Sequence, residues 1–439
     1  MELSVPKSSL ERVVILGGGF AGIKLAKNLS SKKFQVVLID KNNYHQFQPL
    51  FYQVATAGLE PSAISFPFRK LFQKNKNVHF RMTEVEGIDT ANQEVHTDIG
   101  SISYDKLIVS IGATTNFYGN AEIEANVLPL KSTSEALVIR NTLFQTLEDA
   151  LLETNREKRK ALLTIVIVGG GPTGVEVSGS LADMRNLIFP KDYPELDFKE
   201  MEIYLIDGGD RLLAGMKEHA SEKSKEYLEQ LGIKLIQNCR VTSYNGEKLI
   251  LNNGATIHAK TVIWGAGVKA NSLKGLSAEN VLPNGRLAVN AFNQLENESN
   301  IFALGDVAQI QGDEAYPKGH PQVAQVAIQQ ASLLAKNLNK KNSSQWKKFN
   351  YNDLGSMATI GRNLAVVEFP SMKFAGFFAW CVWMFVHLIS LIGTKNKIQT
   401  FLNWVWNYFT YDQSLRLILT PKRREKRNEE ISSVIITKF

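Results

Sequence analysis

The sequence predicts an α/β protein with two Rossmann-type dinucleotide-binding domains and a C-terminal membrane-associating helical extension. Glycine-rich turns follow apolar strand-like runs at residues 12–22 and 164–176, and each turn is followed further on by a run that ends in an aspartate. Residues 374–393 form an apolar run without a charged side chain. The chain has 439 residues, which is too long for one hydrophobic core, so we expect two or three domains.

The composition and net charge of the chain limit the kinds of partner that we expect. Hydrophobic residues make up 44% of the chain and charged residues 21%, which is typical of a folded protein. The net charge of +7 is compatible with nucleic acid, anionic lipid or an anionic cofactor as partner. Zinc-finger spacings and RNA-binding motifs are missing from the sequence, so we expect no nucleic-acid partner.

The cysteines and the N-terminus set the expected compartment. Cys239 and Cys381 are the two cysteines of the chain and form no close pair, so a disulfide framework, a thiolate metal site and a dithiol redox centre are all unsupported. We expect buried or incidental thiols, a reducing cytosol and no metal site. The first residues lead directly into a strand-like run, so we expect no signal peptide.

The first glycine turn lies in RVVILGGGFAG, residues 12–22. Gly17 permits the tight turn, Gly19 lets the backbone approach a pyrophosphate, and Gly22 lets the following helix pack close to the strand. The amide groups of Phe20 and Ala21 belong to the first turn of that helix, whose dipole favours phosphate. The next strand, FQVVLID, ends in Asp40, whose carboxylate can accept hydrogen bonds from a ribose. The sites predicted here are Gly17, Gly19, Phe20, Ala21, Gly22 and Asp40.

The second turn, TIVIVGGGPTGVE at residues 164–176, repeats the spacing with Gly169, Gly171 and Gly174. Its second strand ends in Asp207, further along than the usual ~20 residues. Residues 183–200 account for the difference as an additional loop or an extension of the helix. A carboxylate at this position binds a ribose 2′-OH and repels a 2′-phosphate, so we expect NADH rather than NADPH.

A third signature assigns the two nucleotides. SNIFALGDVAQ, residues 299–309, is a strand that runs into Gly305-Asp306, and YDKLIVSIGATT, residues 104–115, lies between the two glycine turns. This order resembles the flavoprotein disulfide reductase fold. The resemblance implies non-covalent FAD in the first module, with Asp306 at the ribityl chain, and NADH as an exchanging substrate in the second. We expect a split FAD-binding domain at 1–116 and 269–345, an NADH-binding domain at 117–268, and an extension for membrane anchoring and dimerisation at 346–439.

Within this superfamily the chain resembles type II NADH dehydrogenase, the single-subunit NADH:quinone oxidoreductase of respiratory membranes. The resemblance runs nearly end to end. It rests on DKNNYHQFQPLFYQVATAGLEP, VIWGAGV, IFALGDVA, AQVAIQ and GSMATIGR. It implies that hydride passes from NADH to FAD and that two electrons then pass to membrane quinone, without proton pumping. The alternatives are a soluble NADH-dependent flavoprotein reductase of another acceptor and a redox-sensing flavoprotein.

The resemblance also assigns individual residues. Gln325 and Gln329 lie one helical turn apart in AQVAIQ, and the family's glutamines there line the quinone pocket; a plain helix with surface amides is the alternative. Glu176 is implied as catalytic at the nicotinamide–flavin contact, or else it only complements a helix N-terminus. Lys397 is implied near the flavin. Gly112, Val323 and Ala324 complete the expected FAD contacts, and Gly267 completes the NADH contacts.

The apolar run of the extension has three interpretations: a helix on the membrane surface, a transmembrane span, or a buried or dimer-contact helix. Trp380 and Trp383 within the run are typical of an interface. Basic residues flank the run on both sides, including the 422–427 cluster, and a single span would separate them. We therefore expect a peripheral, monotopic protein on the cytoplasmic face of the cell membrane, acting as a homodimer.

Overall fold

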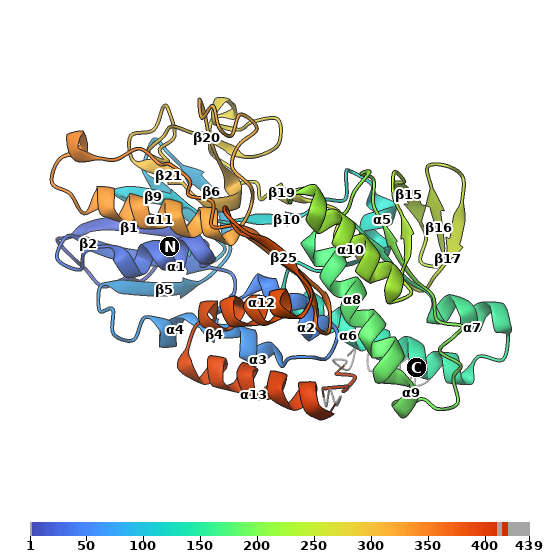
Figure 1. Cartoon of the computed structure of the whole chain (residues 1–439). Helices are drawn as coiled ribbons and strands as arrows, with labels where there is room; N and C mark the ends of the chain where they lie inside the picture. The colour runs from blue at the N-terminus through green and yellow to red at the C-terminus, as the bar shows by residue number, and fades with distance from the viewer. Residues whose placement is uncertain (1, 411–414, 420–439) are drawn as a thin grey trace, which may run out of the picture.

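Two parallel sheets form the body of the protein in the computed structural model, which describes residues 2–410 and 415–419. The first sheet has the strand order β21-β9-β1-β2-β5, and all its pairings are parallel. Helices α1 and α11 pack against each other on this sheet (Figure 1). The elements are β1 (Glu11–Leu16), α1 (Phe20–Asn28), β2 (Phe34–Asp40), β5 (Val78–Met82), β9 (Lys106–Val109), β21 (Ile301–Ala303) and α11 (Ala324–Leu338).

The second sheet repeats the parallel arrangement in the order β11-β18-β12-β13-β14. Two short antiparallel strands, β10 and β19, pair with each other where the chain passes between the two bodies. The elements are β10 (Ala113–Thr115), β11 (Leu128–Pro129), α6 (Thr133–Leu152), α7 (Arg156–Leu163), β12 (Ile165–Val168), α8 (Pro172–Leu187), α9 (Phe189–Asp192), β13 (Ile203–Ile206), α10 (Glu218–Gln230), β14 (Lys234–Ile236), β18 (Thr261–Trp264) and β19 (Val268–Ala270).

Smaller elements surround the two sheets. Two three-stranded antiparallel sheets lie at their edges, and short helices cover the region between β2 and β5. These elements are β3 (Tyr44–Gln46), α2 (Phe51–Ala55), α3 (Pro61–Ile64), β4 (Ser65–Pro67), α4 (Phe68–Leu71), β6 (Val85–Asp89), β7 (Glu94–Thr97), β8 (Gly100–Ser103), α5 (Ala121–Asn126), β15 (Val241–Tyr244), β16 (Lys248–Leu251), β17 (Thr256–His258), β20 (Leu287–Val289) and β22 (Ala308–Ile310).

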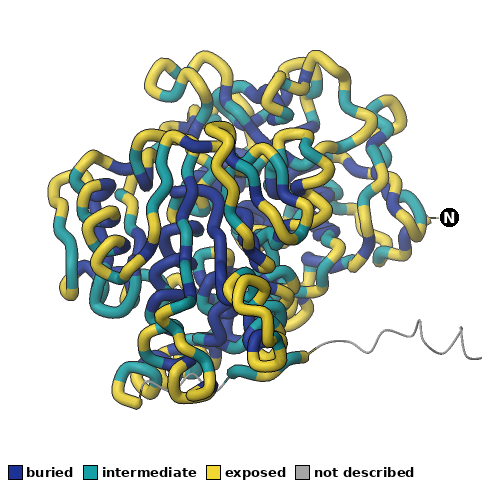
Figure 2. Tube along the Cα trace, turned by 90° about the vertical axis from the view of Figure 1, so that its right-hand side faces the viewer, coloured by how far each residue is buried: buried dark blue, intermediate teal, exposed yellow. Residues whose placement is uncertain are grey.

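The central strands are buried on both faces, as apolar runs in a parallel sheet require. Every residue of β12 is buried, and so are the last four of β1. In Figure 2 the buried segments run through the middle of the molecule, and exposed segments surround them. The largest apolar cluster joins the second sheet, α2, α6 and α8 to the C-terminal extension, so the extension shares its core with the body.

The extension begins with a sheet that the sequence did not predict. Strands β23 (Ser356–Gly361), β24 (Leu364–Glu368) and β25 (Lys373–Ala375) pair antiparallel and lead to α12 (Phe377–Ser390) and α13 (Thr394–Thr410). β23 packs against α8, where a Cβ on Gly179 would lie 1.8 Å from the Ile360 carbonyl oxygen. That glycine is therefore required for the close contact between the extension and the second domain.

The apolar run at 374–393 is divided between elements. Its first residues end β25, Gly376 turns the chain with a φ of +85°, and α12 stops at Ser390. No helix within residues 2–410 and 415–419 has both the length and the hydropathy needed to cross a bilayer. Figure 1 shows α12 and α13 lying beside α2 and α3 along one side of the molecule.

One face of α12 and α13 carries large apolar side chains that are exposed. In α13 they recur at helical spacing, as an amphipathic helix requires. We refer to this set as the apolar face. It comprises Phe377, Phe378, Phe385, Ile389, Ile398, Phe401, Leu402, Val405, Trp406 and Phe409. The basic cluster Lys422, Arg423, Arg424, Lys426 and Arg427 lies outside the described residues.

Residues 415–419 return to the second domain. Arg416 forms an ion pair of 2.6 Å with Asp192 in α9. Asn141 in α6 accepts a hydrogen bond from the Leu419 amide at 3.1 Å and donates one to its carbonyl oxygen at 2.9 Å. The end of the extension is thus fastened to the domain that contains α8.

Candidate functional site

The first glycine turn has the geometry that the sequence predicts. Gly17 has a φ of +94°, and a Cβ there would lie 2.4 Å from the Ser110 carbonyl oxygen. A Cβ on Gly22 would lie 2.0 Å from the Gly17 oxygen, whereas one on Gly19 would meet nothing within 4 Å. No side chain caps α1. The turn therefore offers open space and a helix N-terminus to an anionic group.

Asp40 closes this turn from the end of β2. Its carboxylate accepts hydrogen bonds of 2.7 Å from the Gly18 and Asn42 amides, and burial raises its pKa. Behind the turn, His45 contacts the Gly18 carbonyl oxygen through Nδ1 at 3.2 Å, and Phe20 packs edge-on against its ring. Burial lowers the pKa of His45 to about 4, so the ring is neutral. His45 lies within the run DKNNYHQFQPLFYQVATAGLEP, but no role was predicted for it from the sequence.

The second turn repeats the first in detail. Gly169 has a φ of +112°, a Cβ on Gly174 would lie 1.8 Å from the Gly169 oxygen, and one on Gly171 would meet nothing within 4 Å. Asp207, at the end of β13, accepts hydrogen bonds from the Gly170 and Gly209 amides. The carboxylate thus lies beside the glycine turn, as Asp40 does in the first domain. Residues 183–200 contain the end of α8 and all of α9.

The Gly305-Asp306 turn is held by α11. The side-chain oxygen of Gln330 accepts a 2.7 Å hydrogen bond from the Gly305 amide, and Gln322 donates to the Asp306 carbonyl oxygen at 3.0 Å. Lys131 approaches the Asp306 carboxylate at 3.9 Å. Burial raises the pKa of Asp306, and the charges of Lys131 and Arg286 oppose that rise. Gln330 and Lys131 were not predicted, because neither belongs to a motif.

The predicted quinone-site glutamines hold a loop. Gln325 donates to the Gly355 carbonyl oxygen at 3.1 Å and accepts from the Leu354 amide at 3.1 Å. Gln329 donates to the Asn352 carbonyl oxygen at 2.8 Å and accepts from its amide at 3.0 Å. Both amides therefore bind the segment that leads into β23, and their assignment to quinone stays a prediction.

Four other predicted residues are placed as follows. Val323 is the N-cap residue of α11 and is exposed, and Ala324 is the first residue of that helix. Lys397, near the start of α13, donates to the Ile389 carbonyl oxygen at 2.6 Å, which fastens α13 to the end of α12. Gly112 has a φ of +69° with open space at its Cβ position.

Gly267 lies at the other end of the link between the domains. Its φ is +90°, and a Cβ there would come within 2.7 Å of the Tyr118 hydroxyl oxygen. Residues 265–267 also bound the second glycine turn, since a Cβ on Gly169 would lie 2.6 Å from the Gly265 carbonyl carbon. The predicted role of Gly267 at the NADH site stays a prediction.

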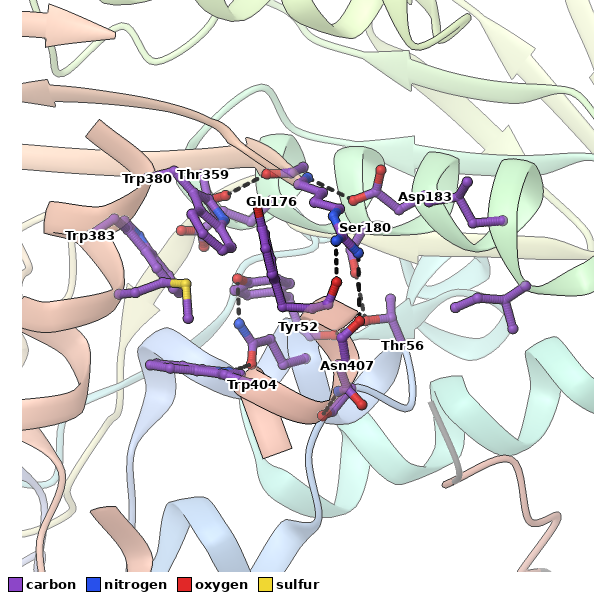
Figure 3. A pocket seen from close by; sticks show the side chains of 18 residues that line it. Tyr52, Thr56, Glu176, Ser180, Asp183, Thr359, Trp380, Trp383, Trp404 and Asn407 are labelled. Atoms are coloured by element: carbon purple, nitrogen blue, oxygen red, sulfur yellow. Dashed lines mark hydrogen bonds between the residues drawn. The ribbon is translucent and has the colours of Figure 1, made fainter. Parts of the chain in front are cut away.

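Glu176 lies in a cavity of about 140 Å³ between α2, α8, β23, α12 and α13 (Figure 3). The side chain is 8% exposed. Burial raises its pKa to about 8, while the Thr359 amide and the Trp383 indole N–H act in the opposite direction. The carboxyl group is therefore mainly protonated at neutral pH. The catalytic role of Glu176 and its alternative role beside the N-terminus of α8 both stay predictions.

One wall of the cavity is aromatic and the other is polar. Trp380, Trp383 and Trp404 come from the extension, and Trp404 donates a 2.7 Å hydrogen bond to Gln53. On the opposite side, the Thr56 and Ser180 hydroxyl groups lie 2.7 Å apart. The cavity was not predicted, because its walls come from segments that are hundreds of residues apart in the sequence.

The described residues contain no cluster of three or more His, Cys, Asp or Glu side chains that could hold a metal ion. Cys239 is buried and accepts a contact of 3.3 Å from the Asn253 side chain, and Cys381 is half-buried in α12. Neither thiol is part of the cavity wall.

Comparison with protein families divides the chain in two. Residues 11–331 match the pyridine nucleotide-disulphide oxidoreductase family, and residues 354–411 match the NDH2 C-terminal domain. The second match covers β23–β25, α12 and α13, which together form the sheet and the apolar face of the extension.

Individual relatives cover nearly the whole chain. The type II NADH:quinone oxidoreductase Ndh of Mycobacterium tuberculosis is 32% identical over 91% of this chain and 88% of its own length. The type II NADH:quinone oxidoreductase of Haemophilus influenzae is 29% identical over 81% and 86%. Among solved structures, NDH2 of Plasmodium falciparum in complex with NADH superposes with a TM-score of 0.86 at 22% identity, covering 93% of this chain and all of its own.

Proposed function

The chain belongs to the pyridine nucleotide-disulphide oxidoreductase family and, within it, to the type II NADH:quinone oxidoreductases, and from this premise we propose how it oxidises NADH and reduces quinone. The reaction consumes one NADH, one quinone and one proton, and it yields NAD⁺ and hydroquinone. It requires no ion translocation. One observation carries the proposal: a single chain joins two dinucleotide-type glycine turns to an exposed apolar face.

The first glycine turn fits FAD. A pyrophosphate would fit the open space over Gly19 and the uncapped N-terminus of α1. Asp40 would contact a ribose and Asp306 a ribityl chain. Bound there, the flavin would accept a hydride and later release two electrons. Gly17, Gly22, Asp40 and Asp306 are the residues that we assign to holding it, and Gln330 fixes the Gly305 turn.

The second glycine turn fits NADH. Gly171 leaves space for the pyrophosphate, and α8 has no side-chain cap, so its first amides are available. The Asp207 carboxylate beside the turn favours a ribose 2′-OH and disfavours a 2′-phosphate. We therefore assign NADH, rather than NADPH, as the substrate.

Glu176 is the acid that we assign to the reaction. It is buried between the NADH-type domain and the extension, and its raised pKa keeps a proton on it at neutral pH. A general acid is most useful when its pKa lies near the working pH. The position on the first turns of α8 places it near the end of the helix where the nucleotide would bind.

The quinone side is assigned to α11 and the segment it holds. The N-terminal part of α11 packs beside Gly305, since a Cβ on that glycine would lie 3.2 Å from the Ala327 Cβ. Gln325 and Gln329 therefore lie on a helix that borders the proposed flavin site. They can donate to quinone oxygens without adding charge, in exchange for their bonds to residues 352–355.

We assign the apolar face of α12 and α13 to the membrane. On α13 the side chains of this face form one apolar stripe along the helix. Burial of the stripe in the interfacial region of a bilayer would release water from each apolar side chain. We propose attachment to the cytoplasmic face, where NADH is available, and a homodimer as the working unit. Equilibrium sedimentation in detergent would test the dimer.

The reaction is tested directly on the detergent-purified protein. We expect a flavin absorption spectrum, release of FAD on denaturation, and NADH oxidation that accelerates on addition of quinone. NADPH should be a poor substitute. A purified, folded protein that binds flavin but oxidises NADH equally slowly with and without quinone would contradict the assignment.

A further inference from the structure

A line of three polar side chains runs along the face of α8 that borders the cavity. Glu176, Ser180 and Asp183 occupy positions i, i+4 and i+7, so they lie above one another along the helix. Seven residues of α-helix rise about 10 Å, so the two acids cannot contact each other directly. Figure 3 shows Ser180 between the two carboxyl groups, and all three line the cavity.

The two acids have different access to water. Glu176 is buried at the inner end, whereas Asp183 at the outer end is partly exposed. Asp183 accepts a hydrogen bond of 2.8 Å from the Arg362 amide, which holds the carboxylate at the turn between β23 and β24. The line of side chains thus begins at Asp183, which solvent can reach, and ends at Glu176, which solvent reaches poorly.

The cavity between the acids has the size and polarity to hold water. A volume of about 140 Å³ exceeds the minimum of roughly 10–15 Å³ that one water molecule requires. Ser180, Thr56, Tyr52 and the two carboxyl groups offer the polar partners that ordered water needs. The hydroxyl pair of Thr56 and Ser180, 2.7 Å apart, bridges the polar wall midway.

We propose that Asp183 supplies Glu176 with the proton that each turnover consumes, through water held against Ser180 in this cavity. The inference rests on the proposed function, because it needs a reaction that consumes a proton. Asp183 acts through Glu176 and is therefore a positioning residue for proton delivery.

The transfer balances without any redox change in the protein. The O–H bond of the Asp183 carboxylic acid breaks, and its proton passes to a water molecule beside Ser180. Glu176 has by then given its own proton to an oxygen of the quinone, so the water passes its proton to a Glu176 carboxylate, and solvent protonates Asp183 again. The electron pairs stay on the oxygen atoms throughout, and the one proton delivered equals the one proton in NADH + H⁺ + quinone.

The charges around the two acids favour this direction. Burial raises the pKa of Asp183 to about 6, with the Arg362 amide and guanidinium opposing the rise, while the pKa of Glu176 is about 8. A proton therefore moves from the weaker base to the stronger one. The other titratable groups that border the cavity are Tyr52 from α2, Arg362 from β23–β24, and Tyr408 from α13.

The test compares Asp183→Asn with Asp183→Glu and with Asp149→Asn, an exposed aspartate on α6 outside the cavity. Asparagine keeps an oxygen for the Arg362 amide but cannot carry a proton. In the full-length, flavin-loaded protein we expect Asp183→Asn to leave flavin reduction by NADH unchanged and to slow reoxidation by quinone at least about tenfold. The slowing should be largest above pH 6 and should be reduced by added formate. Asp183→Glu should restore the pH profile, and Asp149→Asn should match wild type.

A second measurement does not depend on activity. An infrared pH titration of the carboxylic-acid band should lose its lower transition in Asp183→Asn and its upper transition in Glu176→Gln. Two unchanged transitions in Asp183→Asn, or a wild-type pH profile in that variant, would overturn the relay. If the wild-type protein showed both infrared transitions but reduced no quinone, the proposed function would be wrong. The relay would then be wrong as well, because no reaction would consume the proton.

Discussion

The indole N–H of Trp404 in α13 donates a 2.7 Å hydrogen bond to the side-chain oxygen of Gln53 in α2, across 351 positions of sequence. Gln53 in turn donates to the Tyr52 hydroxyl oxygen at 2.8 Å. This pair joins the extension that carries the apolar face to the short helix that borders the cavity of Glu176. Attachment of α13 and the shape of the cavity are therefore coupled.

We predict that Trp404→Phe lowers stability, whereas Trp406→Phe does not. Trp404 is buried and its bond to Gln53 is lost in the variant, which should cost about 0.5–1.5 kcal/mol. Trp406 lies two residues further on and is 59% exposed, so the same substitution there removes little packing. The apparent melting temperature of the detergent-purified protein measures the difference. Equal shifts for both variants would mean that the Trp404–Gln53 bond contributes nothing specific.

The exposed tryptophan serves instead as a test of membrane contact. Trp406→Ser should weaken binding to anionic lipid vesicles, because a large apolar side chain contributes about 1.5–3 kcal/mol on burial. That corresponds to roughly tenfold or more in the partition constant. Ile99→Ser is the matched control, since Ile99 is also exposed but lies in the turn between β7 and β8. Co-sedimentation with vesicles gives the comparison, and equal losses for both variants would exclude a specific role of α13.

Glu176→Gln should change how stability depends on pH. The ordinary pKa of the carboxyl group is 4.5 and burial raises it to about 8, so the folded protein binds this proton more tightly than the unfolded chain. The resulting stabilisation is fully present below pH 4.5 and is lost as the pH rises through about 8. Glutamine mimics the protonated acid and cannot titrate. The melting temperature of Glu176→Gln should therefore fall less than that of wild type between pH 5 and pH 8.

The same pH series also tests whether Glu176 is the group concerned. Asp183→Asn removes the second acid of the cavity, whose pKa of about 6 lies closer to its ordinary value. Its effect on the pH dependence should therefore be smaller and should end at lower pH. Parallel curves for wild type and Glu176→Gln would show that the carboxyl group is already ionised when folded.

Local geometry explains which parts of this site could be predicted from the sequence. The spacing of the glycines predicts the two strand–turn–helix units and the close approach of a pyrophosphate at Gly19 and Gly171, where a Cβ would meet nothing. The neighbours that require glycine at positions 17 and 169 are Ser110 and Gly265, which directly follow strands further along the chain. The aspartates that close the turns follow from the ends of the next strands. The aspartates lie beside the turns, as their sequence positions predict, and their contacts with a ribose stay predictions.

Features that depend on packing between distant segments were not predicted. The cavity needs Trp404 against Gln53 and Thr359 against Glu176, and no periodicity or spacing in the sequence relates those positions. The β23–β25 sheet was not predicted, because GSMATIGR was used only as a mark of the family resemblance and residues 374–393 were interpreted only as an apolar run. The turn at Gly376 then divides that run, which hydropathy alone treats as continuous.

Asp207→Asn should relax the choice between NADH and NADPH. The variant removes the charge that disfavours a 2′-phosphate, while its remaining oxygen can still accept from the Gly170 amide. We expect kcat/KM for NADH to fall and the NADH/NADPH ratio of kcat/KM to decrease by roughly tenfold, which equals about 1.4 kcal/mol. Asp210→Asn removes a neighbouring exposed charge and should leave the ratio closer to wild type. An unchanged ratio in Asp207→Asn would remove this residue from the nucleotide site.

The last prediction concerns Gln325 and Gln329, for which the family resemblance implies a quinone contact and the structure adds a second role. Replacing both by leucine removes four hydrogen bonds to residues 352–355, so the melting temperature should fall. If the amides also bind quinone, stopped-flow absorbance should show normal flavin reduction by NADH and quinone reoxidation slowed roughly tenfold to a hundredfold. Gln330→Leu is the contrasting variant, because its lost bond is to Gly305 and should weaken flavin retention instead. The double variant could instead have a lower melting temperature but a wild-type rate of flavin reoxidation by quinone. These glutamines would then have the structural role alone, which is to hold the segment that leads into β23.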